Sequence, residues 1–222
     1  LAASLKALPP DHPLIPLLRN APDLRTECAL ADALLHPQDR AYSVPQLFNF
    51  LAAGGFSFGR WLRQAAYLPQ CGVLASSPHQ PLLTRLPMPE QYAAVELFRG
   101  SMVRHSVVAY RNDRPNHESL DFTGDAWLGY VPIRMANTIC VQEKLPPGAA
   151  AVLINRSHTY TDIYLPINAQ QKNLYDAVDG KRSIGEIAPE TALRNIARVL
   201  FEGLWQYDQV VFDASRHSRS PG

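Results

Sequence analysis

The chain has 222 residues, 46% of them hydrophobic, which allows one large or two small domains and is ample for a core. Its 21 basic and 20 acidic residues give a net charge of +1, which argues against nucleic acid or an anionic membrane as a partner. No apolar run approaches the roughly 20 residues of a membrane-spanning helix. Nothing resembles a signal peptide, and three widely spaced cysteines (Cys28, Cys71 and Cys140) predict reduced, buried thiols, so we expect a cytoplasmic location.

Short helices are expected in the first 42 residues. Prolines recur through residues 1–23 and restrict any helix there to pieces such as 14–19. Residues 24–35 predict a helix that is closed by His36-Pro37. The chain also opens in the middle of an apolar, helix-favouring run, as we would expect of a fragment or a processed product.

The strongest local pattern follows at residue 43. Ser43 and Gln46 have the spacing of a capping box, and Pro45 occupies the first turn, where its missing N–H costs nothing. Apolar residues then recur at helical spacing up to Gly54-Gly55, which provides a residue free to become left-handed. The sequence therefore predicts a helix that begins at Ser43 and stops at these glycines.

Two strands and a second helix are expected before the chain reaches a boundary. Residues 56–62 have strand composition, and residues 67–89 carry five prolines that predict a long ordered loop or short turns. A helix is predicted over 89–100 and a β-branched strand over 102–111. The polar run 111–116 is the best domain boundary, which divides the chain into 1–113 and 114–222.

The run YSVPQLFNFLAAGG and the strand that follows it resemble the C-terminal portion of class I S-adenosylmethionine-dependent methyltransferases. The resemblance implies that residues 56–62 and 102–111 are the sixth and seventh strands, at the antiparallel end of the family's sheet. The family's strand, glycine-rich loop and helix for the cofactor are absent from this sequence. The resemblance therefore implies S-adenosylmethionine for the parent enzyme, no cofactor-binding residue in this chain, and a missing N-terminal methyltransferase half as its partner.

Strands and three capped helices are expected after the boundary. Residues 127–141 have strand composition, and 149–155 with 160–167 predict a hairpin around the polar residues 156–159. Asn168 with Gln171, and Ser183 with Glu186, match helix caps, and Pro189 is expected to open a long amphipathic helix before a final strand over 209–213. The predicted fold class is α+β.

The stretch LYDAVDGKRSIGEIA resembles the small winged-helix-like domain of the pyrroloquinoline quinone biosynthesis protein D type, with Asp179-Gly180 as the turn between two helices. Residues 168–222 carry seven basic and seven acidic residues, so no positive surface for DNA is predicted. The resemblance instead implies a peptide or protein ligand, bound by strand addition at the hairpin edge.

Candidate substrate-side residues are His36, Asp39, Arg40, Tyr42 and Tyr67. The first three form the densest polar cluster, and the tyrosines, with Trp61, could line an apolar acceptor pocket. A local structural role for the cluster and core packing for Trp61 are the alternatives. Neither a metal site nor catalytic residues can be assigned, and His105 is expected to be a hydrogen-bonded core histidine.

Two functions remain open. In the first, the chain is the non-cofactor-binding region of a methyltransferase, which acts by placing an acceptor in line with the methyl group. It would contribute substrate-side, regulatory or dimerisation surface and would be inactive alone. In the second, it is a stand-alone peptide-binding or protein-binding module without catalysis. If residues 56–62 and 102–111 are the outer strands of a larger sheet, one edge is left unpaired, which predicts a two-fold homodimer through these strands or through the helix that begins at Ser43.

Overall fold

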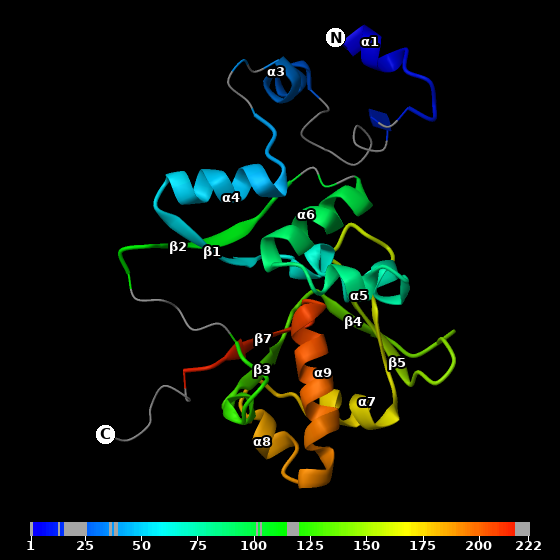
Figure 1. Ribbon diagram of the computed structural model, residues 1–222. Coiled ribbons are helices and arrows are strands. Elements are labelled where there is room, and N and C mark those ends of the chain that lie inside the picture. The colour runs from blue at the N-terminus through cyan, green and yellow to red at the C-terminus, as the bar shows by residue number, and fades with distance from the viewer. Residues whose placement is uncertain are drawn as a thin grey trace. The chain divides into compact units, whose positions relative to one another are not determined.

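The computed structural model describes residues 2–12, 14–15, 26–35, 37, 40–100, 102, 104–114 and 120–215 (Figure 1). The chain divides into two compact units, residues 1–42 and 43–222. The first unit contains α1 (Ala2–Lys6) and α3 (Glu27–Leu35). None of the helices in the described ranges is long and apolar enough to cross a membrane.

The second unit begins with the predicted capped helix, α4 (Val44–Ala53). The Ser43 N–H donates to the Gln46 side-chain oxygen at 2.9 Å, and Gly55 adopts the left-handed conformation just beyond the helix, with φ of 74°. A carboxylate oxygen of Glu96 accepts from the Val44 N–H at 2.8 Å. The predicted ends of this helix are confirmed, and Glu96 adds a long-range cap that sequence spacing does not reveal.

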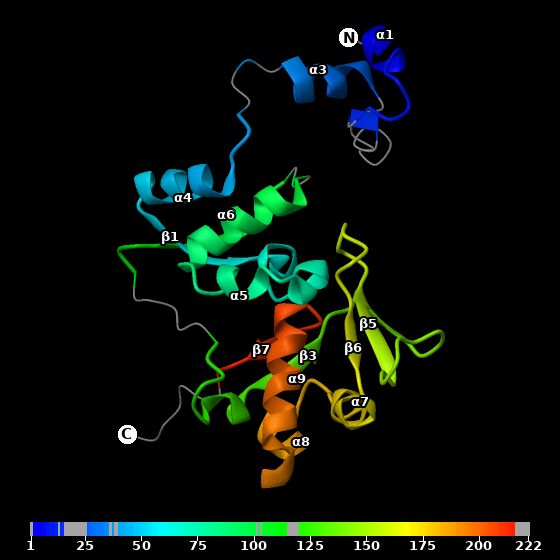
Figure 2. The ribbon, with the colours of Figure 1, turned by 45° about the vertical axis from the view of Figure 1, so that its right-hand side comes forward.

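Two strands and a second long helix surround α4. Strand β1 (Phe56–Trp61) pairs antiparallel with β2 (Val107–Arg111), with a shift of register between Phe58 and Arg60. Figures 1 and 2 show α4 and α6 (Met88–Arg99) side by side over this pair. Short helices η2 (Gln64–Tyr67), η3 (Gly72–Ser76) and α5 (Gln80–Leu83) occupy the proline-rich stretch, as the predicted turns require.

The remainder of the second unit mixes antiparallel strands with helices. Strands β4 (Thr138–Val141), β5 (Ala151–Asn155) and β6 (Leu165–Ile167) form one sheet in that order, and β3 (Val131–Arg134) pairs with β7 (Val210–Asp213). The helical elements are η4 (Ala126–Gly129), α7 (Ala169–Asp176), α8 (Ile184–Ile187), η5 (Thr191–Leu193) and α9 (Arg194–Gln206). Helices and antiparallel sheets confirm the α+β class, whereas the methyltransferase and winged-helix assignments stay predictions.

Three local predictions need correction. The hairpin strand begins at residue 165 rather than 160, because Ile163 is buried in the core around Trp61 and Asp162 binds Arg99 there. The final helix starts at residue 194, after a short 3-10 turn. Cys71 is buried as expected, but Cys28 and Cys140 are exposed.

Two hydrophobic cores occupy the second unit. The aromatic core consists of Val44, Trp61, Ala65, Ala66, Tyr67, Leu68, Cys71, Tyr92 and Ile163. The helical core lies around α9; among the described residues its buried members fall between Phe122 and Val210 and include Leu200 and Phe201, with Leu120, Phe212 and Ala214 packed against it. The boundary predicted after residue 113 falls between most members of the two cores, but within a single compact unit, and it stays a prediction.

Candidate functional site

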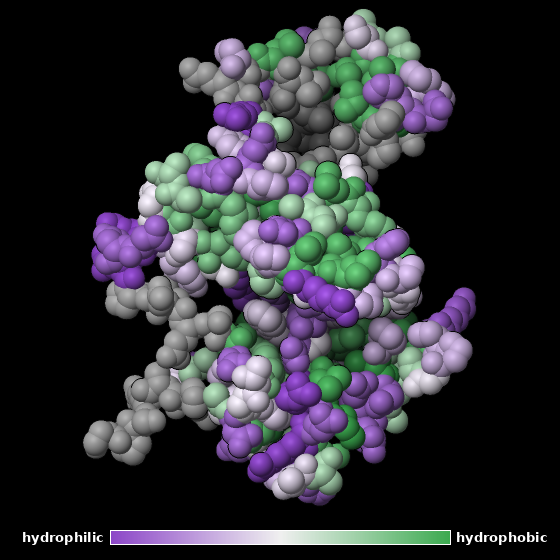
Figure 3. Space-filling view, in the orientation of Figure 1, coloured by the Kyte–Doolittle hydropathy of each residue, from purple (hydrophilic) through white to green (hydrophobic). Residues whose placement is uncertain are grey.

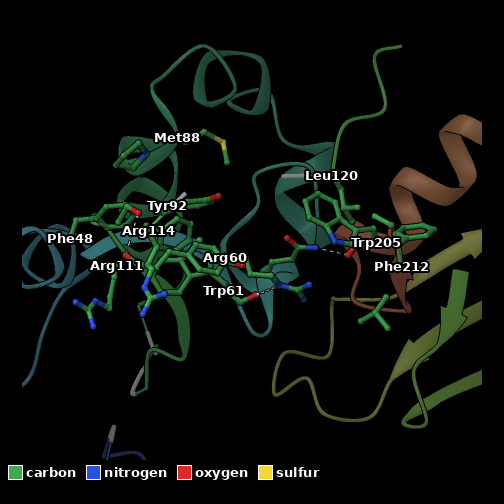
Figure 4. A pocket seen from close by; sticks show the side chains of 18 residues that line it. Phe48, Arg60, Trp61, Met88, Tyr92, Arg111, Arg114, Leu120, Trp205 and Phe212 are labelled. Atoms are coloured by element: carbon green, nitrogen blue, oxygen red, sulfur yellow. Dashed lines mark hydrogen bonds between the residues drawn. The ribbon is translucent and has the colours of Figure 1, made fainter. Parts of the chain in front are cut away.

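A cleft of about 750 Å³ opens within the second unit (Figure 4). Its lining combines aromatic rings, aliphatic groups and arginines: Phe48, Ser57, Phe58, Gly59, Arg60, Trp61, Gln64, Met88, Pro89, Tyr92, Tyr110, Arg111, Arg114, Leu120, Trp205, Val211, Phe212 and Ala214. Figure 4 shows Trp61, Tyr92 and Phe48 on one side, Trp205, Phe212 and Leu120 on the other, and Arg60 between them. This size is typical of small-molecule sites.

Packed aromatic rings form the first wall of the cleft. Phe48 stacks on Phe58 with ring centroids 4.9 Å apart, and Phe58 meets Trp61 edge to face at 5.0 Å. Behind them the Trp61 ring stacks nearly parallel on Tyr67 at 3.9 Å. Because each ring is held by others, the wall presents fixed flat apolar surfaces to the cleft.

The close approach of Tyr110 explains the glycine in β1. A Cβ atom at Gly59 would collide with the Tyr110 ring and would lie 2.9 Å from the Val108 carbonyl oxygen. Gly59 sits at the register shift between Phe58 and Arg60, where a β-bulge bends the strand. The absent side chain therefore allows the ring of Tyr110 to lie across β1, where it lines the cleft.

The second wall comes from α9, β7 and the segment before η4. It carries the half-buried side chains of Trp205, Phe212 and Leu120. Gln64, which is buried, donates from its side-chain amide to the Trp205 carbonyl oxygen at 2.6 Å. This bond ties the end of α9 to the stretch that follows β1, so the two walls are directly connected.

Below the cleft, the two cores meet at Asp208. This buried residue has a left-handed backbone with φ of 54°, and its carboxylate accepts from the N–H groups of Gln64 and Ala65 at 3.2 and 3.0 Å. Burial raises the pKa of Asp208 to about 6, against the lowering effect of those two hydrogen bonds and of nearby arginines. His158 Nε2 lies 3.5 Å from the carboxylate, and burial lowers the pKa of that histidine.

A second junction involves Arg99. Its guanidinium, 3% exposed, binds Asp162 at 3.1 Å, donates to the Ala66 carbonyl oxygen and lies 4.3 Å from the Tyr160 ring centroid. Partial burial opposes ionisation of Asp162, but hydrogen bonds from the Val73 N–H and from Arg99 lower its pKa overall. The loop before β6 is thus anchored to the aromatic core by a charged pair.

A hydrogen-bonded chain of three side chains lies beside α6. Glu96 binds His105 Nε2 at 3.2 Å, and the other ring nitrogen of His105 lies 2.8 Å from the Tyr67 hydroxyl. Burial, followed by the charges of Tyr160 and Glu96, raises the pKa of Tyr67. Because its pKa is raised, the Tyr67 hydroxyl keeps its proton and is a poor acid, and Glu96 is already engaged as the α4 cap, so this chain of contacts positions elements. The expected role of His105 is confirmed.

None of the candidate substrate-side residues that the structure describes lines the cleft. His36 and Asp39 lie outside the described residues, and the Arg40 guanidinium lies 5.5 Å from the Tyr42 ring centroid in the first unit. Tyr67 is buried in the aromatic core and borders a separate hollow of about 110 Å³. Both alternatives considered for Trp61, core packing and pocket lining, apply: its ring is packed in the core with 1% exposed, and it also borders the cleft.

Sequence inspection missed Arg60, Trp205 and Asp208. Arg60 precedes Trp61 in a predicted strand, but the local sequence pattern does not indicate that its side chain faces a cleft. Among the described residues no group of three histidine, cysteine, aspartate or glutamate side chains is arranged to hold a metal ion. No family model matches the chain.

Proposed function

We propose that this chain is the acceptor-side region of an S-adenosylmethionine-dependent methyltransferase, with the acceptor held in the cleft between the two cores. The cleft of about 750 Å³ with its aromatic wall is the observation that carries the proposal, because such sites bind small, largely apolar molecules. The antiparallel pair β1–β2 beneath α4 supports it, since the resemblance implies that pair. The cofactor would be bound by the N-terminal half that the resemblance implies.

Cofactor binding tests this function. Calorimetry with S-adenosylmethionine should show no affinity tighter than about 100 μM for the 222-residue chain, which corresponds to roughly 5.5 kcal/mol. The polypeptide that includes the residues encoded before Leu1 should bind the cofactor and contain a strand, a glycine-rich turn and a helix. Tight binding by the short chain, or none by the longer polypeptide, would contradict the proposal.

We also propose that the protein forms a homodimer. Figure 3 shows hydrophobic residues over α5 and α6, where Leu82, Leu97 and Phe98 are 61%, 82% and 53% exposed. Apolar patches of this kind commonly mark contact surfaces, and β1–β2 is a two-stranded pair within the described residues. Sedimentation at micromolar concentration should show a dimer that Leu97→Lys weakens, and a clean monomer would refute the dimer.

Peptide binding is the second candidate function, supported by a groove of about 440 Å³. The groove runs between the edge strand β6 and α9, where Leu165, Ile167 and the half-exposed Val199 form its apolar surface. However, the Ile167 carbonyl oxygen accepts from Ala150 on the β5 side, so its neighbour Pro166 faces outward without an N–H. The outward edge of β6 therefore offers an incoming strand few backbone bonds.

Peptide display separates this function from the first. Peptides that occupy the groove should lose binding when Val199 is replaced by Asp and keep it when the exposed Arg194 is replaced by Ala. Selected peptides that bind Val199→Asp equally well would rule out the groove as the peptide site.

A further inference from the structure

The cleft has a strongly one-sided charge. Three arginines line it, Arg60, Arg111 and Arg114, and no aspartate or glutamate does. The whole chain is nearly neutral, so this local excess is not a reflection of composition. A cleft lined by one sign of charge attracts ligands of the opposite sign.

Little in the described part of the chain neutralises these guanidinium groups. Arg111 binds Asp113 at 2.6 Å, but both side chains are about 60% exposed, where an ion pair contributes little. Arg60 donates from Nε to the Trp61 carbonyl oxygen at 3.3 Å, and its charge acts on the buried carboxylate of Asp208. Among the described residues, neither Arg60 nor Arg114 forms an ion pair with a carboxylate. Their remaining N–H groups can serve a ligand.

The other chemistry of the cleft is flat and apolar. Phe48 and Phe58 are half-buried and present their rings on one side, packed against the buried rings of Trp61 and Tyr92. Trp205 and Phe212 lie on the other side. Stacking between two such walls favours a planar ligand. Arginine can add to that stacking and can bind a carboxylate or phosphate through paired N–H donors.

From this combination we infer that the cleft binds a planar aromatic molecule that carries one anionic substituent, with its ring between Phe58 and Trp205 and its anionic group on Arg60 and Arg114. The inference rests on the proposed acceptor-side role of the cleft and gives the chemical class of the acceptor. Carboxylate, phosphate and sulfonate share the required chemistry, because each offers several acceptor oxygens with a negative charge.

Matched fluorescent probes test this inference on the full chain without any cofactor. The first probe is 8-anilinonaphthalene-1-sulfonate, and the second is N-phenyl-1-naphthylamine, which has the same rings without the sulfonate. The sulfonate should bind at least about tenfold more tightly, the factor that one charge-assisted hydrogen-bonded contact supplies. Competition with 1-naphthoate and with 1-naphthyl phosphate then distinguishes a carboxylate ligand from a phosphate ligand.

Arginine variants locate the charge selectivity. Arg60→Met and Arg114→Met should each weaken the sulfonate probe about tenfold and leave the neutral probe unchanged. Arg85→Met is the matched control, because Arg85 is exposed and does not line the cleft. Arg114 is exposed, so its variant keeps the test informative if Arg60→Met fails to fold.

Two results would overturn the inference. One is equal affinity for the charged and neutral probes, or no binding of either. The other is selectivity for the sulfonate that survives both arginine substitutions. Because no titration contains S-adenosylmethionine, the probes can bind as expected even if the methyltransferase proposal fails, and the cofactor titrations can succeed even if this inference fails.

Discussion

The two cores of the second unit are built in different ways. The helical core is closed by residues from its own stretch of chain, between Phe122 and Val210. The aromatic core takes most of its residues from 44–92 but is completed by Ile163, with Tyr160 and Tyr207 packed against it. A core that borrows side chains from a distant segment depends on the folding of that segment, so the dependence should run in one direction.

The largest effect is expected from a charge in the helical core. Leu200 is 2% exposed, and Leu200→Asp should destabilise the protein by several kcal/mol because an unpaired charge would be buried. With 5-fluorotryptophan labels, the resonances of Trp127, in the helical core, and Trp61 should both lose their native positions. Val44→Asp, in the aromatic core, should instead change Trp61 and spare Trp127.

Two results would contradict the prediction that the aromatic core depends on the helical core but not the reverse. If Leu200→Asp leaves the Trp61 resonance in place, the aromatic core folds alone and the boundary after residue 113 separates independent domains. If each substitution disturbs both resonances, the two cores depend on each other equally.

A smaller effect should come from protonation at the junction. The pKa of Asp208 rises from 3.8 to about 6 on folding, so the folded state binds a proton more tightly than the unfolded state does. Stability from this residue is therefore present below pH 4 and falls by about 3 kcal/mol as the pH rises through 6. The neighbouring groups are His158, Arg60 and Arg63.

Urea unfolding across pH 4–7 measures this effect as the difference between the wild type and Asp208→Asn. Asparagine tolerates the left-handed backbone at residue 208 and has no proton to bind. His158 has the opposite sign, since its lowered pKa makes stability rise with pH through 6.5, and His158→Gln should remove that rise. Parallel pH curves for the wild type and Asp208→Asn would mean that the carboxylate is not perturbed.

A loss of about 2 kcal/mol is expected from Asp162→Ala. The substitution leaves the Arg99 guanidinium buried without its carboxylate, and the exposure of Asp162, 29%, reduces the cost below that of a fully buried pair. Asp113→Ala breaks the exposed Arg111 pair instead and should lower the free energy of unfolding by only about 0.5 kcal/mol. If chemical denaturation shows equal losses in the free energy of unfolding for the two variants, the buried Arg99–Asp162 pair contributes no more than the exposed Arg111–Asp113 pair.

An effect smaller than that of Asp162→Ala should come from Gly59→Ala. The new Cβ meets the Tyr110 ring and the Val108 carbonyl oxygen, and both must move, at a cost of at least about 1 kcal/mol. Because Tyr110 lines the cleft, affinity for the naphthalene sulfonate should change as well, whereas Gly203→Ala, whose Cβ meets open space, should leave it alone. If Gly59→Ala binds the probe with unchanged affinity, the β-bulge at Gly59 does not influence ligand binding in the cleft.

Local patterns predicted the parts of the fold that local chemistry determines. Asn168 with Gln171 and Ser183 with Glu186 form capping boxes at α7 and α8, and Gly180 is left-handed in the predicted turn. Asp179 accepts from the N–H groups of Lys181 and Arg182, which fixes that turn within four residues. Such contacts can be inferred because both partners are neighbours in sequence.

The candidate site could not be predicted in this way. The bonds from Gln64 and Ala65 to Asp208 join residues more than 140 positions apart, and no periodic pattern marks either end. The arginines of the cleft come from strand β1, the last residue of β2 and the turn after β2, where sequence shows only that they are polar. These arginines share one cleft with Trp205 and Phe212 because the two cores dock against each other, and local sequence patterns carry no information about that docking.

The position of the cleft between two cores has a consequence for thermal behaviour. A ligand that touches Phe58 and Trp205 together binds only when both cores are folded and docked. At a free concentration one hundred times its dissociation constant, it would raise the stability of that docked state by about 2.7 kcal/mol. Saturating ligand should therefore merge separate melting transitions into one. Conversely, a substitution at Asp162, which is not a lining residue of the cleft, should lower the fraction of molecules in which the two cores are docked. The apparent affinity for the ligand should fall in proportion to that fraction.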